Sequence, residues 1–262
     1  MTPYGFTIDS LKEIAKKAGN AILEVYITDF NDNIELKDDN SPLTLADKRA
    51  HGIIEAGLNS LPVKYPILSE ESIIPNYKIR KSWELFWMVD PLDGTKEFIN
   101  KNGDFTVNIA LIKKGKVVFG CIQVPVENVC YWGLEGSGSF REKDGQVKRL
   151  KVKTFDAKTK GLKILGSRSH MNQDTRDYLG QFDNPVLLAR GSSLKMMMIA
   201  EGKADLYPRM GPTMEWDTAA SQIILEEAGG SMKKIDELTD LVYNKEDLLN
   251  PYFIASAKRI QR

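Results

Sequence analysis

The chain has 262 residues, of which 42% are hydrophobic and 27% charged, so it can bury a sizeable core as one large domain or two closely packed halves. Lys plus Arg and Asp plus Glu both number 36, and this balance gives no reason to expect a nucleic-acid groove or a polybasic membrane anchor. No apolar run approaches the roughly 20 residues of a membrane span, and the first residues lack the pattern of a signal peptide.

The two cysteines, Cys121 and Cys130, lie in no CxxC or metal-ligand pattern. We expect them to be small buried thiols, not a disulfide, which is typical of a reducing compartment. The sequence therefore predicts a cytoplasmic protein. Loose association with the inner membrane stays open, as does the choice between a monomer and a homodimer.

Two amphipathic helices are predicted first. Apolar residues at helical spacing over 11–25 indicate one, with Ser10 and Glu13 as the capping box at its start. The second begins after Thr44, a cap residue, and has Asp47 three positions later. Asp47 is therefore interpreted first as the acid of a helix start.

Short apolar runs and turn residues then alternate along the chain. Strands are predicted at 65–68, 84–89, 105–113, 117–124, 129–134, 162–165, 186–189 and 204–207. Helices are predicted at 95–99, 174–182, 193–201 and 216–228. Glycines at 136, 138 and 145 indicate turns. This mixture favours an α+β fold of stacked layers, a single compact unit built from halves 1–153 and 154–262.

Acidic residues collect where predicted elements end or begin, namely Glu70, Asp90, Asp93 and Asp217. Strand ends and helix starts share one edge of a layered fold, so we expect these carboxylates to converge. Converging carboxylates repel each other unless a cation lies between them, and Mg²⁺ prefers oxygen ligands. Each residue alone has a simpler interpretation, as a turn for Asp90 to Asp93 and as a helix cap for Asp217.

Gly94 and Thr95 start the short predicted helix 95–99, and their N–H groups can bind an anion there. An anion site beside a pair of metal ions about 4 Å apart suits hydrolysis of a phosphate ester, because metals activate water and stabilise the leaving oxygen.

Three motifs in this order resemble the inositol monophosphatase superfamily. They are Ser69-Glu70-Glu71-Ser72, Asp90-Pro91-Leu92-Asp93-Gly94-Thr95, and Trp216 to Ala220 together with Glu227 to Gly230. The segments 40–47, 95–98 and 243–251 are similar to the 3'(2'),5'-bisphosphate nucleotidase branch of that superfamily. The resemblance implies an αβαβα sandwich and a lithium-sensitive enzyme with two or three Mg²⁺ ions. It implies hydrolysis of the 3'-phosphate of adenosine 3',5'-bisphosphate (PAP), with its sulfated relative PAPS left open.

Residue roles also follow from the resemblance. Metal ligands would be Glu70, Asp90, the Leu92 carbonyl, Asp93 and Asp217, all but Asp90 also near the substrate. Gly94 and Thr95 would hold the scissile phosphate, and the Thr95 hydroxyl with Asp47 would orient and deprotonate the attacking water. Lys195 and Arg209 would bind the 5'-phosphate, and His170 and Ser192 the ribose or base.

Two alternatives remain. One is a phosphatase of the same metal chemistry acting on inositol monophosphate or a sugar bisphosphate. The other is a phosphonucleotide-binding regulator without catalysis. In both, the partner is a small molecule and not a nucleic-acid polymer.

Overall fold

The computed structural model describes residues 1–28, 34–36, 42–166 and 172–260. Helix α1 (Ile8–Ile27) begins earlier than predicted, because the Thr7 hydroxyl accepts a hydrogen bond from the Ser10 N–H at 3.1 Å. The prediction of Ser10 and Glu13 as the capping box is therefore wrong. The buried face of the helix follows the predicted apolar positions.

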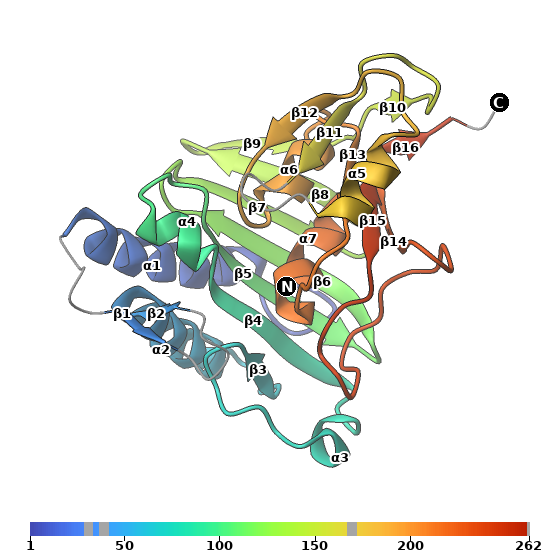
Figure 1. Ribbon diagram of the computed structural model, residues 1–262. Helices are drawn as coiled ribbons and strands as arrows, with labels where there is room; N and C mark the ends of the chain where they lie inside the picture. The colour runs from blue at the N-terminus through green and yellow to red at the C-terminus, as the bar shows by residue number, and fades with distance from the viewer. Residues whose placement is uncertain (29–33, 37–41, 167–171, 261–262) are drawn as a thin grey trace.

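Helix α2 (Leu45–Ser60) follows a short hairpin of β1 (Ile34–Leu36) and β2 (Pro42–Thr44). Its predicted start is confirmed, since Thr44 is the cap and Asp47 accepts from the Thr44 N–H at 2.8 Å. Helices α1 and α2 lie together on one face of the larger sheet (Figure 1).

The larger sheet has seven strands in chain order, from β3 to β9. They are β3 (Ile67–Ser69), β4 (Leu85–Asp93), β5 (Thr106–Lys113), β6 (Lys116–Val124), β7 (Val129–Leu134), β8 (Gly138–Lys143) and β9 (Gln146–Arg149). Only the first pair, β3 with β4, is parallel. The sequence predicted the first five strands, but only turns where β8 and β9 lie.

The smaller sheet is mixed and has the strand order β12-β11-β13-β15-β14. Its strands are β11 (Lys163–Gly166), β12 (Val186–Ala189), β13 (Leu206–Arg209), β14 (Ser231–Lys234) and β15 (Phe253–Ser256). A separate parallel pair joins β10 (Thr154–Phe155) to β16 (Lys258–Arg259). The last part of the chain thus returns to complete the second half.

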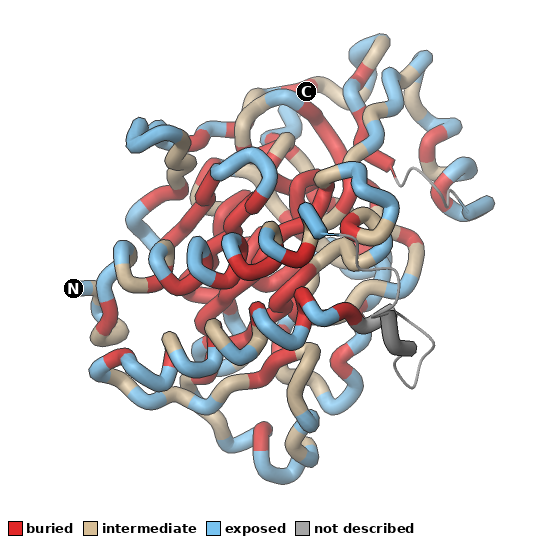
Figure 2. The backbone as a smooth tube through the Cα atoms, turned by 90° about the vertical axis from the view of Figure 1, so that its left-hand side faces the viewer, coloured by how far each residue is buried: buried red, intermediate tan, exposed pale blue. Residues whose placement is uncertain are grey.

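Two helices fill the space between the sheets, α6 (Leu194–Ala200) and α7 (Glu215–Glu227), and α5 (Gln173–Leu179) packs outside the smaller sheet. Figure 1 shows these five layers, which confirm the predicted αβαβα arrangement. In Figure 2 the central strands are buried, and the outer helix surfaces are exposed. The remaining helices are short, α3 (Tyr77–Arg80) and α4 (Thr95–Ile99).

Helix α7 lies unusually close to the larger sheet, because glycines stand beneath it. A Cβ built at Gly120 on β6 would come within 2.4 Å of the Ala220 carbonyl oxygen. A Cβ at Gly133 on β7 would lie 3.0 Å from the Ile224 Cα. The absence of side chains at these two positions therefore sets the height of α7 above the sheet.

Both cysteines are free and buried, with their sulfur atoms 3.6 Å apart on β6 and β7, as the sequence predicted. The Cys121 thiol, and burial, hold the pKa of Cys130 well above its ordinary value. Among the described residues, every helix is too short or too polar to cross a bilayer.

Candidate active site

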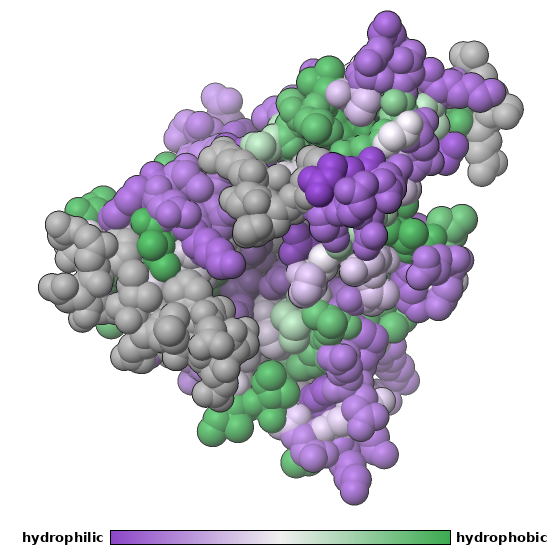
Figure 3. Space-filling model, viewed as in Figure 1, coloured by the Kyte–Doolittle hydropathy of each residue, from purple (hydrophilic) through white to green (hydrophobic). Residues whose placement is uncertain are grey.

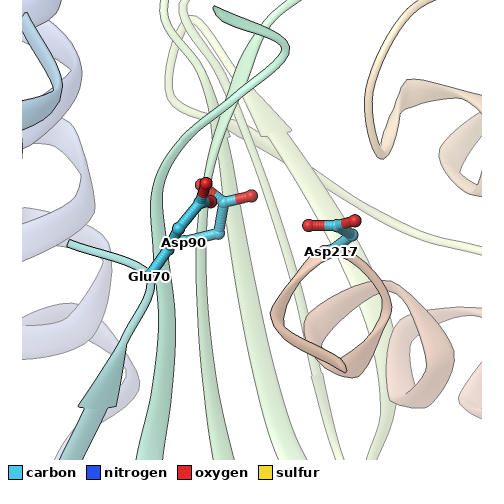
Figure 4. Close-up of side chains that lie close together, drawn as sticks. All are labelled: Glu70, Asp90 and Asp217. Atoms are coloured by element: carbon cyan, nitrogen blue, oxygen red, sulfur yellow. The ribbon is translucent and has the colours of Figure 1, made fainter. Parts of the chain in front are cut away.

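Three carboxylates meet at the edge of the larger sheet, and their oxygens lie within 4.8 Å of one another: Glu70, Asp90 and Asp217. Parallel pairing explains the first two. Ser69 on β3 is in register with Val89 on β4, and the Glu70 N–H donates to the Val89 carbonyl at 3.1 Å. Glu70 and Asp90 thus emerge side by side, and Asp217 faces them from the start of α7 (Figure 4).

Asp217 has two roles at once. One of its oxygens, Oδ2, accepts from the Met214 N–H at 2.9 Å and closes the first turn of α7. Burial raises the pKa of Asp217 well above its ordinary value, and the Asp93 and Glu70 carboxylates raise it further. The helix-cap interpretation is therefore correct, and it does not compete with a place in the acidic cluster.

Strand β4 continues through the acidic motif, where the sequence predicted a turn after residue 89. Asp90 pairs with Asn108 and Asp93 with Thr106, and the register shifts between them. Residues three apart on a regular strand point to opposite faces, but the extra residue of the bulge lets Asp90 and Asp93 pair with residues two apart on β5, so both side chains point to the same face. Asp93 consequently lies beside the three-carboxylate cluster, with its Oδ2 2.7 Å from the Ser193 nitrogen.

A tight turn follows the bulge and starts helix α4. Gly94 has φ +96°, a conformation that glycine adopts without strain, and a Cβ there would lie 3.0 Å from the Asp104 carbonyl oxygen. The turn places the amino end of α4 beside the carboxylates. Free N–H groups at a helix start are a suitable cradle for a phosphate.

The Thr95 hydroxyl lies 3.4 Å from Asp47 Oδ1 and 3.3 Å from the Leu92 carbonyl oxygen. The other Asp47 oxygen accepts from the Thr44 N–H and, at 2.6 Å, from the Thr44 hydroxyl. Asp47 is only 1% exposed. Its capping oxygen is thus occupied, and its second oxygen faces Thr95 in the site.

A cleft of about 760 Å³ extends from these groups towards the smaller sheet. Its lining includes Asp93, Gly94, Ser192, Lys195, Arg209 and Asp217. Figure 3 shows a hollow near the centre of this face, with hydrophilic side chains among those that border it. A cleft that carries both acidic and basic side chains suits an anionic ligand held partly through metal ions and partly through cationic groups.

The two bases are held differently. The Lys195 side chain is 9% exposed, and its ammonium lies 5.4 Å from the Tyr207 ring centroid and 3.3 Å from the Arg190 carbonyl oxygen. The Arg209 guanidinium donates to the Pro212 carbonyl at 2.6 Å and to the Thr213 hydroxyl. Ser192, also in the cleft, has φ +42°.

Comparison with known families gives a clear match, because the model of the inositol monophosphatase family covers residues 7–262. The chain belongs to this family. The 3'(2'),5'-bisphosphate nucleotidase CysQ of Escherichia coli K12 is 42% identical over 249 residues, which are 95% of this chain and 99% of that protein. CysQ of Haemophilus influenzae is 35% identical over 92% of this chain and 89% of its own.

Solved structures of the inositol monophosphatase family superpose well. CysQ from Bacteroides thetaiotaomicron has a TM-score of 0.83 at 42% identity, with 96% of this chain and 97% of that chain covered. An inositol monophosphatase from Thermotoga maritima, at 22% identity, has a TM-score of 0.77 and covers 95% and 91% of the two chains. The second match supports the fold alone.

The acidic cluster fits the metal on which enzymes of the inositol monophosphatase family generally depend. Its donors are hard carboxylate oxygens, and burial, followed by the neighbouring Asp93 and Glu70 carboxylates, raises the pKa of Asp217 above its ordinary value. Of the predicted site residues, only His170 lies outside the described part of the chain.

Several polar residues lie behind the site that were not predicted from the sequence. Thr106, Asn108 and Ser193 contact Asp93, and Asp104 accepts from the Gly191 N–H at 2.9 Å. A signal was present, because Thr106 and Asn108 are polar residues two apart at the start of an otherwise apolar strand. Such a pair points to one face of a strand.

Proposed function

We propose that this protein hydrolyses the 3'-phosphate of adenosine 3',5'-bisphosphate with Mg²⁺, giving AMP and phosphate. The observation that supports it most is a single cleft lined by both acidic and basic side chains. Asp93, Asp217 and the Gly94 turn line it together with Lys195 and Arg209, and Asp217 joins it to the cluster of Glu70 and Asp90. The relatives named as 3'(2'),5'-bisphosphate nucleotidases agree with this assignment.

The metal ions, two or three Mg²⁺, would be held by Glu70, Asp90, Asp93, Asp217 and the Leu92 carbonyl. When bound, they would supply positive charge that acidifies a water and stabilises the oxygens of the phosphoryl group. The donor set is all oxygen, which is the preference of Mg²⁺.

The remaining chemistry falls to the protein's own groups. The N–H groups of Gly94 and Thr95 bind the scissile phosphate at the start of α4. The Thr95 hydroxyl accepts a hydrogen bond from the attacking water and passes a proton to Asp47. The water oxygen bonds to phosphorus, the bond to the ribose 3'-oxygen breaks, and that oxygen takes a proton from solvent.

The basic residues of the cleft select the substrate. Lys195 and Arg209 bind the non-reacting 5'-phosphate, since both present cationic donors that suit phosphate. Ser192 and His170 are assigned to the ribose or base. The halves 1–153 and 154–262 act as one unit, because the cleft takes residues from both.

The deciding experiment measures phosphate release with Mg²⁺ from PAP, 5'-AMP, inositol 1-phosphate and fructose 1,6-bisphosphate. PAP should have the highest kcat/KM. A preference for inositol 1-phosphate or the sugar bisphosphate would replace the nucleotidase assignment, and PAP binding without turnover would indicate a regulator.

Two variants test the metal-binding group and the 5'-phosphate-binding group separately. Asp90→Asn should abolish turnover while the protein stays folded. Arg209→Ala should raise KM for PAP roughly ten- to hundredfold, since a charge-assisted hydrogen bond is lost. The same variant should change KM for adenosine 3'-phosphate little, because that substrate has no 5'-phosphate. An equal loss on both substrates would contradict the role of Arg209.

A further inference from the structure

Three buried polar side chains lie behind Asp93 and form one hydrogen-bonded chain: Thr106 and Asn108 on β5, and Ser193 just before α6. Thr106 and Ser193 are completely buried, and Asn108 is 1% exposed. Buried polar groups cost free energy unless they are hydrogen-bonded, so a chain of three inside a core requires a reason.

The direction of each hydrogen bond can be assigned. Ser193 donates twice to Asp93 Oδ2, from its N–H at 2.7 Å and from its hydroxyl at 2.8 Å. The Asn108 amide nitrogen donates to the Ser193 hydroxyl oxygen at 2.9 Å and lies 3.3 Å from the same Asp93 oxygen. The Thr106 hydroxyl donates to the Asn108 amide oxygen at 3.0 Å.

These donations fix the orientation of the amide. A flipped Asn108 would place its oxygen against the Asp93 carboxylate, and its NH₂ group would face the Thr106 hydroxyl. The observed order gives every hydrogen an acceptor, from Thr106 through Asn108 and Ser193 to Asp93. Thr106 therefore acts on Asp93 mainly through the residue between them.

All side-chain hydrogen bonds that the described residues make to Asp93 end on Oδ2. Asp93 also lines the cleft beside Asp217, whose main-chain carbonyl lies 3.2 Å from the Ser193 hydroxyl. The Ser193 hydroxyl thus contacts the carboxylate of Asp93 on β4 and the main chain of Asp217 on α7.

We propose that Ser193, Asn108 and Thr106 are positioning residues that hold Asp93 by Oδ2 and leave Oδ1 as its single metal-binding oxygen. This inference rests on the proposed function, in which Asp93 is a metal ligand. Groups that orient a ligand in this way typically change metal affinity ten- to hundredfold when they are removed.

The test measures binding of Mn²⁺, a spectroscopic substitute for Mg²⁺, by calorimetry in the absence of substrate. Ser193→Ala deletes one oxygen and should weaken binding ten- to hundredfold. Thr106→Val keeps the shape of the side chain and should weaken binding through Asn108; it also serves if Ser193→Ala does not fold. The matched control is Ser139→Ala, which should bind Mn²⁺ as the wild type does. Ser139 on β8 is an equally buried hydroxyl that has no hydrogen-bond partner among the described residues.

Kinetics add a second readout. With the preferred substrate, Ser193→Ala should lower kcat and raise the Mg²⁺ concentration needed for half activity, while KM for the nucleotide changes less than about threefold. A crystal structure with Mn²⁺ should show Asp93 bound through Oδ1 alone. Wild-type affinity in both Ser193→Ala and Thr106→Val, or bidentate binding by Asp93, would overturn the inference.

The two proposals fail separately. If the wild-type protein turns over none of the nucleotides but Ser193→Ala still binds Mn²⁺ more weakly than Ser139→Ala, the positioning inference stands and the substrate assignment falls. If PAP is turned over and the Mn²⁺ affinity is unchanged in both Ser193→Ala and Thr106→Val, the substrate assignment stands and the positioning inference fails.

Discussion

Gly120→Ala tests whether the close approach of α7 to the larger sheet sets the geometry of the site. The new Cβ would come within 2.4 Å of the Ala220 carbonyl oxygen and 2.9 Å of the Ala220 Cα. Ordinary contacts begin near 3.4 Å, so α7 must move by about 1 Å, because backbone on both sides cannot rotate away. Overpacking of this kind costs about 1–3 kcal/mol of stability, and the rigid neighbours favour the upper end.

The displacement also reaches the chemistry, since Asp217 lies in the first turn of the same helix. A misplacement of about 1 Å can cost roughly a hundredfold in rate. Urea unfolding and kcat at saturating Mg²⁺ measure the two effects. The control is Gly52→Ala in α2, where a Cβ meets nothing within 4 Å. That variant should gain up to about 1 kcal/mol of stability, because alanine has a higher helix propensity than glycine. If Gly120→Ala matched the wild type in stability and kcat, the close-packing argument would be refuted.

Two further predictions concern single carboxyl groups. Asp47→Asn should lower kcat roughly 10²- to 10⁴-fold with little change in KM, because the amide cannot accept the proton passed by Thr95; steady-state kinetics measure it. Burial raises the pKa of Glu226 to about 7, against 4.5 for an ordinary glutamate, although Gln222 donates to it at 2.9 Å. The folded state thus holds this proton more tightly, so stability falls as pH rises from 4.5 to 7. Glu226→Gln should therefore raise the free energy of unfolding by about 1–3 kcal/mol at pH 8 and leave it unchanged at pH 4. Urea unfolding at the two pH values measures this difference. An equal change at both pH values would show that the charge of Glu226 does not affect stability.

Local sequence signals predicted most of the first half of the fold. Apolar periodicity located α1 and the first five strands of the larger sheet, and the capping residues located the start of α2. Strands β8 and β9 were missed, because their residues are largely polar and half-exposed or exposed at the sheet edge. Strands with a solvent-exposed face at the edge of a sheet have few apolar residues, so their sequences lack a clear hydrophobic pattern.

Site residues that belong to sequence motifs could be predicted, and those that join the site only through tertiary contacts could not. Glu70, Asp90 and Asp217 were placed together in advance, and the structure groups them. The continuation of β4 through Asp93 was not predicted, because a bulge depends on the partner strand and an Asp-Pro-Leu-Asp-Gly run is typical of a turn. Ser193 lies 100 residues from Asp93, and no local pattern links them.

Asp47 and Asp217 share an arrangement that decides how the site should be probed. Each sits in the first turn of a helix and uses one oxygen to accept the N–H of the cap residue. The other oxygen belongs to the site, as Asp47 Oδ1 does beside Thr95. Alanine at either position would remove both functions, and the lost cap alone costs about 0.5–2 kcal/mol. Asparagine keeps an oxygen for the cap and removes the charge, so its effect on kcat reports chemistry. Because each carboxylate closes the first turn of its helix, formation of that turn also places the carboxylate at the candidate site.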